Sequence, residues 1–263
     1  MAEPATTERT RELRLRFVEA CGFWNESFAE LLRTDEEFFC AYLALVETTA
    51  SRGALSPRLR ELVHVAVDAA ATHMYAPGVR EHIAGALREG ASASEVMEVL
   101  ELTATLGIHA CTLGVPILLD ELEAAGLSVD ATSAARAAAL RDEFVAARGY
   151  WNEFWDGLVA LDPEFFSAYT TFSGVPWTHG PLGAKEKELI YTAFDVAATH
   201  LFAPGLRQHI RNALSYGASA AEVLEVFEIA TTLGIHACNL GVPILVEELA
   251  TAEGRGGVAE EVP

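Results

Sequence analysis

The sequence repeats itself at an interval of 127 residues. Residues 71–83, which read ATHMYAPGVREHI, match residues 198–210, which read ATHLFAPGLRQHI. Residues 105–122 match residues 232–249 equally well, and 14–127 aligns with 141–254 without a gap. This interval is far longer than that of a solenoid repeat, which indicates a tandem duplication of one small domain. We expect a first repeat over 1–127, a second repeat over 140–254 and a flexible tail over 255–263.

Each copy has the spacing of helices rather than strands. Mostly apolar side chains recur at positions i, i+3, i+4 and i+7 within 96–103 and within 223–230. Ser92 with Glu95, and Ser219 with Glu222, form capping-box patterns that begin helices. The first copy predicts helices near 9–33, 35–48, 57–71, 77–89, 92–105 and 108–124, and the second predicts the same set 127 residues later. Alternating β-branched residues and Asn-Gly turns are absent from the sequence. We predict an all-α protein of two tandem helical bundles with about six helices each.

The composition excludes several classes of partner. The chain has 18 Lys and Arg residues against 38 Asp and Glu residues, a formal net charge of −20. A surface this acidic repels phosphate backbones and anionic lipids, which argues against nucleic-acid binding and membrane docking. The N-terminus has no apolar signal core, and no run approaches the roughly 20 apolar residues of a membrane span, so we expect a cytoplasmic protein. The four cysteines include no C-x-x-C pair and suggest no disulfide framework.

Six of the eight histidines fall in matched pairs of the repeat. The pairs are His73 and His200, His82 and His209, and His109 and His236. The repeat also retains two acidic pairs and a cationic pair near them, namely Glu61 and Glu188, Asp68 and Asp195, and Arg80 and Arg207. Because the two copies have diverged widely elsewhere, these polar pairs are the candidate functional residues.

An acid and an imidazole in each copy suggest proton transfer. Glu61 and Asp68 are seven residues apart and share a helical face, which is either a solvated stripe or a carboxylate held inside a bundle. His82 lies about one turn into a helix that begins near Pro77, where the helix dipole favours the neutral imidazole of a general base. The alternative for His82 is a structural core histidine. Arg80 is either a surface charge or a clamp for a substrate carboxylate.

The same histidines leave a metal site open as an alternative. Three imidazoles and a carboxylate per copy could hold a divalent ion, with His73, His82 and His109 in the first copy. The corresponding residues of the second copy are His200, His209 and His236. Their spacing matches no standard metal signature. Our main interpretation therefore needs no cofactor, with a divalent metal as the alternative.

One stretch of each copy resembles a known family. The pattern L-x5-E-L at 55–62, followed by H-x3-A-x3-G-A-S-x2-E at 82–95, resembles the carboxymuconolactone decarboxylase family, which includes the alkyl hydroperoxidase D-like proteins. The likeness covers nearly all of each copy and occurs twice in phase. It implies small all-helical units that assemble into trimers or hexamers with sites at helix and subunit junctions. A homotrimer of this tandem chain would then mimic a hexamer of single repeats.

The resemblance disfavours the peroxidase branch of that family. The branch uses E-x11-C-x2-C-x3-H, but counting from Glu61 places His73 and Ala76 at the two cysteine positions. Two further residues then precede His82. Peroxide reduction through a disulfide cycle needs both thiols, one to attack and one to resolve. The decarboxylase branch lacks those cysteines and keeps the histidine, which matches this chain better.

The resemblance therefore implies an enzyme, a lyase that acts on a small carboxylated lactone or a related acid. Loss of CO2 from such a substrate leaves a dienolate, which must be stabilised and then protonated on carbon. The catalytic residues would be His82, His209, His73, His200, Glu61 and Glu188, with Arg80 and Arg207 binding the substrate carboxylate. The alternatives are a metal-dependent enzyme on the same fold and a non-catalytic ligand-binding or assembly protein.

Overall fold

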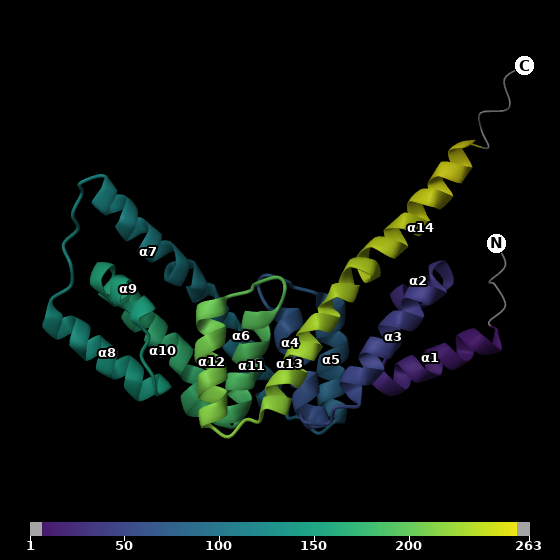
Figure 1. Ribbon diagram of the computed structural model, residues 1–263, viewed down its shortest axis with the longest axis horizontal. Coiled ribbons are helices and arrows are strands. Elements are labelled where there is room, and N and C mark those ends of the chain that lie inside the picture. Colours follow the sequence, from purple (N-terminus) through teal and green to yellow (C-terminus); the bar gives the residue numbers. More distant parts are fainter. Residues whose placement is uncertain (1–6, 257–263) are drawn as a thin grey trace, which may run out of the picture.

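The computed structural model describes residues 7–256, in which every regular element is a helix (Figure 1). The first repeat contains α1 (Glu8–Cys21), α2 (Glu26–Thr34), α3 (Glu36–Ala50), α4 (Pro57–Ala69), α5 (Ala76–Arg88), α6 (Ala93–Ala104), η1 (Thr105–Ile108) and α7 (His109–Ala124). The second contains α8 (Ala134–Arg148), η2 (Glu153–Trp155), α9 (Asp156–Leu161), α10 (Pro163–His179), α11 (Ala184–Val196), α12 (Ala203–Ser215), α13 (Ala220–Thr232), η3 (Leu233–Ile235) and α14 (His236–Gly256). The all-α prediction is confirmed. The tail expected over 255–263 begins inside α14, and its remainder lies outside the described residues.

The helix predicted over 9–33 is wrong, because two helices occupy that stretch. α1 ends at Gly22, whose φ of 80° is left-handed and favours glycine. Asn25 then caps α2, and its side chain accepts a hydrogen bond of 3.2 Å from the backbone N–H of Phe28. The second repeat breaks at the matching glycine, Gly149, with φ 79°. The other predicted helices of the first copy end within two residues of the observed ones.

Three helices from each repeat form the centre of the molecule. α4, α5 and α6 pack with α11, α12 and α13, and the two sets share one hydrophobic core (Figure 1). Leu62 and Val63 of α4 are fully buried in this core beside Leu189 and Ile190 of α11. Each such side chain contributes about 1.5–3 kcal/mol through burial. The two repeats are therefore joined by a common core instead of each closing its own.

Buried carboxylates tie the two repeats together at the edge of this core. Glu225 of α13 is fully buried and accepts backbone hydrogen bonds of 2.7 and 3.0 Å from Ala54 and Leu55, just before α4. Its other oxygen accepts from the guanidinium of Arg60 at 2.8 and 3.0 Å. In the mirrored place, Glu98 of α6 binds Lys187 of α11 at 2.9 Å. Each repeat thus supplies an acid that holds the start of the central helices of the other.

The outer helices exchange partners between the repeats. α14, the last helix of the second repeat, packs on α2 of the first, while α7 packs on α9 of the second (Figure 1). Phe17 and Phe28 form an aromatic cluster of the first repeat that Ile235 of the second repeat completes. Phe144 and Ile108 share the corresponding cluster on the other side. A cavity beside either cluster is consequently built from both repeats.

Two helical stretches are long and apolar enough to cross a membrane, by length and composition alone. They run over 93–124 and 220–252, and a third of each apolar window is buried inside the protein. Neither stretch contains an unbroken run of 20 apolar residues. Each is divided by a 3₁₀ turn, η1 or η3, and its first part lies in the shared core. The second parts, α7 and α14, carry the exposed apolar residues, including Leu113 and Leu240.

Candidate active site

The two residues that carry the sequence hypothesis meet in the first repeat. Nδ1 of His82 on α5 lies 2.8 Å from Oε2 of Glu61 on α4. The close approach of the helices depends on Gly85, because a side chain there would collide with the Glu61 carboxylate. The imidazole is only 8 % exposed. A carboxylate that accepts from Nδ1 fixes the ring and leaves Nε2 as the nitrogen for proton transfer.

Aromatic rings hold the His82 imidazole on two sides. His64, one turn along α4 from Glu61, stacks on it with ring centroids 4.1 Å apart and planes 5° from parallel. Phe23 meets the same ring edge-on at 5.6 Å. Burial and the nearby His82, His236 and Arg60 charges hold the pKa of His64 well below its usual range, so this ring is neutral near pH 7. The stack restricts His82 without adding charge beside it.

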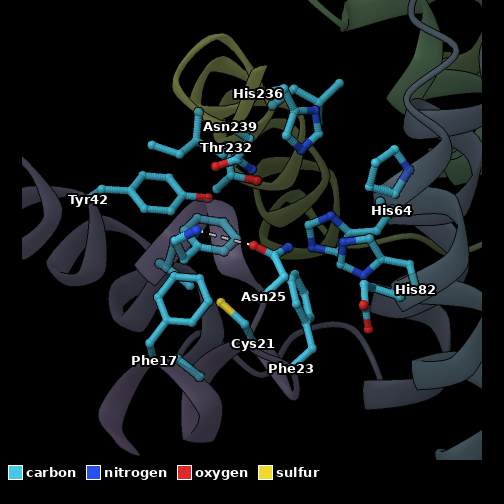
Figure 2. Close-up of a pocket in the computed structure, with 18 of the residues that line it drawn as sticks. Phe17, Cys21, Phe23, Asn25, Tyr42, His64, His82, Thr232, His236 and Asn239 are labelled. Carbon is cyan, nitrogen blue, oxygen red and sulfur yellow. Dashed lines mark hydrogen bonds between the residues drawn. The ribbon is translucent and has the colours of Figure 1, made fainter. Parts of the chain in front are cut away.

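These imidazoles form one wall of a cavity of about 70 Å³ (Figure 2). Figure 2 shows His64 and His82 on one side and Tyr42 on the other, with Cys21 and Phe23 below. The second repeat contributes residues at the end of α13 and the start of α14, among them Thr232, His236 and Asn239. The lining is thus largely apolar with a few converging polar groups, as in small-molecule sites. Burial raises the pKa of the Cys21 thiol, which therefore stays protonated and unreactive.

The second repeat has the same pair in a filled site. Nδ1 of His209 lies 2.6 Å from Oε2 of Glu188, and Tyr191 stacks on the imidazole in the position of His64. Asn212 replaces Gly85 and donates to the other oxygen of Glu188 at 3.1 Å. The cavity beside this pair has only about 20 Å³. Both oxygens of Glu188 are therefore occupied, and little room remains for a ligand.

A buried arginine accounts for the lost volume. Arg148 is only 3 % exposed, and its guanidinium lies 5.2 Å from the ring centroids of both Trp177 and Tyr191. The first repeat has Cys21, Ala50 and His64 at these three positions. Three smaller side chains therefore leave open in the first repeat the space that three larger ones fill in the second.

The remaining candidate histidines come together across the repeats, not within them. Nε2 of His73, in the α4–α5 turn, lies 2.7 Å from Nδ1 of His236 at the start of α14. Nε2 of His200 lies 2.6 Å from Nδ1 of His109 in the mirrored place. His73 and His200 thus lie beside Asp68 and Asp195 and make no hydrogen bond to the glutamates among the described residues. Nε2 of His82 and of His209 also approaches these aspartates, at 3.9 and 4.0 Å. The structure also corrects the expectation that the three histidines of one copy would converge, because the exchange of outer helices brings in a histidine of the other copy.

Each histidine pair faces a buried aspartate to which no described residue donates a hydrogen bond. Oδ1 of Asp68 lies 3.8 Å from His73 and 3.7 Å from His236, beyond hydrogen-bond range. Within residues 7–256, both oxygens of Asp68 and both of Asp195 lack a partner although the two residues are fully buried. Burial raises the pKa of each carboxyl to about 7 against the opposing influence of His82 or His209.

The two arginines predicted to bind substrate lie elsewhere. Arg80 and Arg207 are exposed, and Arg80 lines a separate surface hollow with Met74 and Val79. Their positions on α5 and α12 turn them away from the imidazoles at 82 and 209, so the predicted carboxylate clamp does not fit this placement. The cation that lines the first cavity is Arg60, which is also bound to Glu225.

Sequence reasoning missed His64, Arg60 and Arg148. His64 falls outside the matched histidine pairs because its counterpart is Tyr191, although its spacing of three from Glu61 places both on one helical face. Arg60 has the same one-residue relation to Glu61 that Lys187 has to Glu188, which was a usable signal. Nothing in the local sequence indicates that Arg148 is buried.

Comparison with known proteins places these features in a family. The sequence model of the Carboxymuconolactone decarboxylase family matches residues 36–115 and again 163–238, more than half of the chain. The chain belongs to this family. A solved structure of a candidate gamma-carboxymuconolactone decarboxylase subunit from Burkholderia xenovorans LB400 is similar, with 45% sequence identity and a TM-score of 0.89 over 92% of this chain and 98% of that one. No curated protein matches the chain significantly. The two matches of the carboxymuconolactone decarboxylase model each contain one Glu–His pair, at 61 and 82 and at 188 and 209.

Proposed function

We propose that the chain is a decarboxylase that acts on a small carboxylated lactone or a related acid, and that its first repeat carries the active site. The observation that carries the proposal is the Glu61–His82 hydrogen bond of 2.8 Å at the wall of the open cavity. The membership of the carboxymuconolactone decarboxylase family supports the reaction class.

In this mechanism His82 moves the proton. The bond between the substrate ring carbon and its carboxylate breaks, CO2 leaves, and the electron pair remains as a dienolate conjugated with the lactone carbonyl. His82 then delivers the proton on Nε2 to carbon, while the Glu61 carboxylate holds the ring and stabilises its cationic form. The imidazole regains its proton from solvent. Positioned acid–base catalysis of this kind contributes about 10²–10⁴-fold.

The cavity supplies groups suited to the charge of the substrate. Arg60 is the cation among the lining residues, and it binds Glu225 through Nε and Nη2, so that Nη1 makes no hydrogen bond to any described residue. We assign to Arg60 the role that the sequence suggested for Arg80. The Tyr42 hydroxyl faces His82 across the cavity, where it can donate to the developing oxyanion (Figure 2). Burial holds the pKa of Tyr42 well above its usual range, which keeps this donor protonated.

The two repeats provide a matched experiment. CO2 release from a panel of carboxylated γ-lactones, including gamma-carboxymuconolactone, is measured with the full chain and with His82→Ala, Glu61→Gln, His209→Ala and Glu188→Gln. We expect kcat to fall at least 100-fold in the first two variants and to change less than threefold in the other two. Wild-type turnover in His82→Ala, or no turnover of any panel member by the unaltered chain, would overturn the proposal.

A further inference from the structure

Two clusters outside the Glu–His pairs have the composition of metal sites. The first consists of Asp68, His73 and His236, and the second of Asp195, His200 and His109. In each cluster one carboxylate oxygen and two ring nitrogens lie within 4.8 Å of one another. The acid–base chemistry proposed above assigns no step to these side chains, although Nε2 of His82 lies 3.9 Å from Oδ2 of Asp68, and Nε2 of His209 lies 4.0 Å from Oδ2 of Asp195. Each cluster also joins residues of both repeats, because the second histidine of each comes from the exchanged helix.

The unpartnered aspartates indicate that each cluster is suited to bind a cation. Asp68 is fully buried, and neither of its oxygens accepts a hydrogen bond from the part of the chain that the structure describes. The backbone of α5 crosses close over this carboxylate at Gly78, where a side chain would collide with Oδ2. Asp195 and Gly205 repeat the arrangement. A buried ionised carboxylate is unfavourable unless it is paired or binds a cation, so the same unmet requirement occurs twice in one chain.

The histidines of both clusters are held in place beside the aspartates. Tyr75 stacks on His236 with centroids 3.8 Å apart, and Phe202 stacks on His109 at the same distance. The chain turns sharply after the other histidine of each pair, with Met74 at φ 53° and Leu201 at φ 52°, a conformation that side chains other than glycine rarely adopt. These turns aim His73 and His200 back at the aspartates. Ring stacking and the strained turns therefore fix the positions of the histidines in both clusters.

We propose that each cluster binds one divalent transition-metal ion, with Asp68, His73 and His236 as the ligands of one and Asp195, His200 and His109 as the ligands of the other. Two imidazoles and one carboxylate suit Zn²⁺, Fe²⁺ or Mn²⁺, with further positions left for water. The donor atoms around one tetrahedral ion stand about 3.3–3.5 Å apart. In the first cluster the two histidine nitrogens are 2.7 Å apart, and they lie 3.7 and 3.8 Å from Oδ1 of Asp68. Shifts of under about 1 Å would therefore bring the three atoms to the spacing that an ion requires.

An ion in this place would connect the two repeats. His236 is the first residue of α14, whereas Asp68 and His73 belong to α4 and the turn that follows it. The ion would thus hold the outer helix of one repeat to the central bundle of the other.

Metal stoichiometry tests the inference independently of catalysis. The full chain is stripped with a chelator and titrated with Zn²⁺ by calorimetry, and with Co²⁺ while its visible absorption is recorded. We expect two equivalents per chain, one in Asp68→Asn, none in Asp68→Asn/Asp195→Asn, and a melting temperature that rises by several degrees with Zn²⁺ only where a site remains. The asparagine keeps the shape of the aspartate, and circular dichroism checks that each variant is helical.

Two controls make the result specific. The exposed His179→Ala, and His82→Ala, should both retain two equivalents, and the second separates metal binding from the turnover that it is expected to lose. A wild-type stoichiometry other than two, or two equivalents still bound by the double asparagine variant, would overturn the inference and leave the proposed decarboxylation untouched.

Discussion

Arg148 of the second repeat stands where the first repeat has Cys21, 127 residues earlier, and its guanidinium fills the space that remains open beside His82. The surrounding aromatic rings of Trp177 and Tyr191 stabilise this buried cation. The Glu–His pair is thus retained in both repeats, whereas room for a ligand is retained in one. A duplicated chain can keep room for a ligand in one repeat alone, since the Glu–His pair of the second repeat still packs in the core without binding a substrate.

Filling the first cavity in the same way should abolish turnover. Cys21→Arg places the second repeat's side chain in the first, and we expect kcat/KM to fall at least 100-fold because the substrate is excluded. Cys21→Ala should remain within threefold of wild type, because the buried, protonated thiol takes no part in the chemistry. The two variants are compared in steady-state kinetics of CO2 release, and equal activities would contradict the role assigned to the cavity.

A second, uncharged substitution tests the same cavity in case the Cys21→Arg variant misfolds. Ala50→Trp introduces the indole that Trp177 supplies in the second repeat, and Ala50 also lines the first cavity. We expect the same loss of kcat/KM with a cooperative melting transition. A folded Ala50→Trp protein with normal turnover would count against a substrate site at this cavity.

The buried Glu225 should matter more to stability than the partly exposed Glu228 beside it. Glu225→Ala leaves the Arg60 guanidinium and the N–H groups of Ala54 and Leu55 without their partner, so we expect the free energy of unfolding to fall by about 3–5 kcal/mol. Glu228 binds the half-exposed Arg52 at 2.9 Å, and Glu228→Ala should cost less than about 1 kcal/mol. Urea denaturation of both variants provides the comparison, and similar losses would refute it.

Local sequence patterns predicted the helices and the Glu–His pairs well. The capping boxes at Ser92 and Ser219 are both present, because their hydrogen bonds involve residues only three apart. Glu61 and His82 lie on consecutive helices joined by a short turn, so their contact follows from an antiparallel helix pair. The break of the first helix at Gly22 was missed because the apolar periodicity continues on both sides of it.

Relations between the repeats could not be predicted in this way. A sequence repeat indicates that two segments fold alike, but it does not indicate which copy a terminal helix packs against. The meeting of His73 with His236 depends on that choice, as does the contribution of Asn239 to the first cavity. The different orientation of Arg80, by contrast, could have been predicted from local spacing, since a residue two positions from His82 on a helix points to another side.

The half-buried His64 should make the protein less stable in mild acid. Because burial lowers its pKa in the folded state, the unfolded chain binds a proton below about pH 6.5 that the folded chain does not. The free energy of unfolding therefore falls as pH drops, by up to about 1.4 kcal/mol per pH unit for this group. Between pH 7 and 5, metal-stripped wild type should lose about 1–2 kcal/mol more than His64→Phe. Urea denaturation at pH 7, 6 and 5 measures the difference, with the exposed His179→Phe as control, and parallel curves for wild type and His64→Phe would contradict the assignment.

The exposed apolar faces of α7 and α14 should form the interface of a homo-oligomer. Leu113 and Leu240 are 65 % and 67 % exposed and occupy matching places on the two outer helices, followed by further exposed leucines and isoleucines. Burying such faces between copies is favourable, whereas exposed apolar stripes are uncommon on monomers. We propose a trimer, in which the six repeats are arranged like a hexamer of single units.

Light scattering after gel filtration should give three times the chain mass of 28.3 kDa for wild type and a smaller species for Leu113→Glu/Leu240→Glu. Leu15→Glu, an equally exposed position on α1, should leave the trimer intact. A monomeric wild type, or a double variant of unchanged mass, would show that these faces have another use.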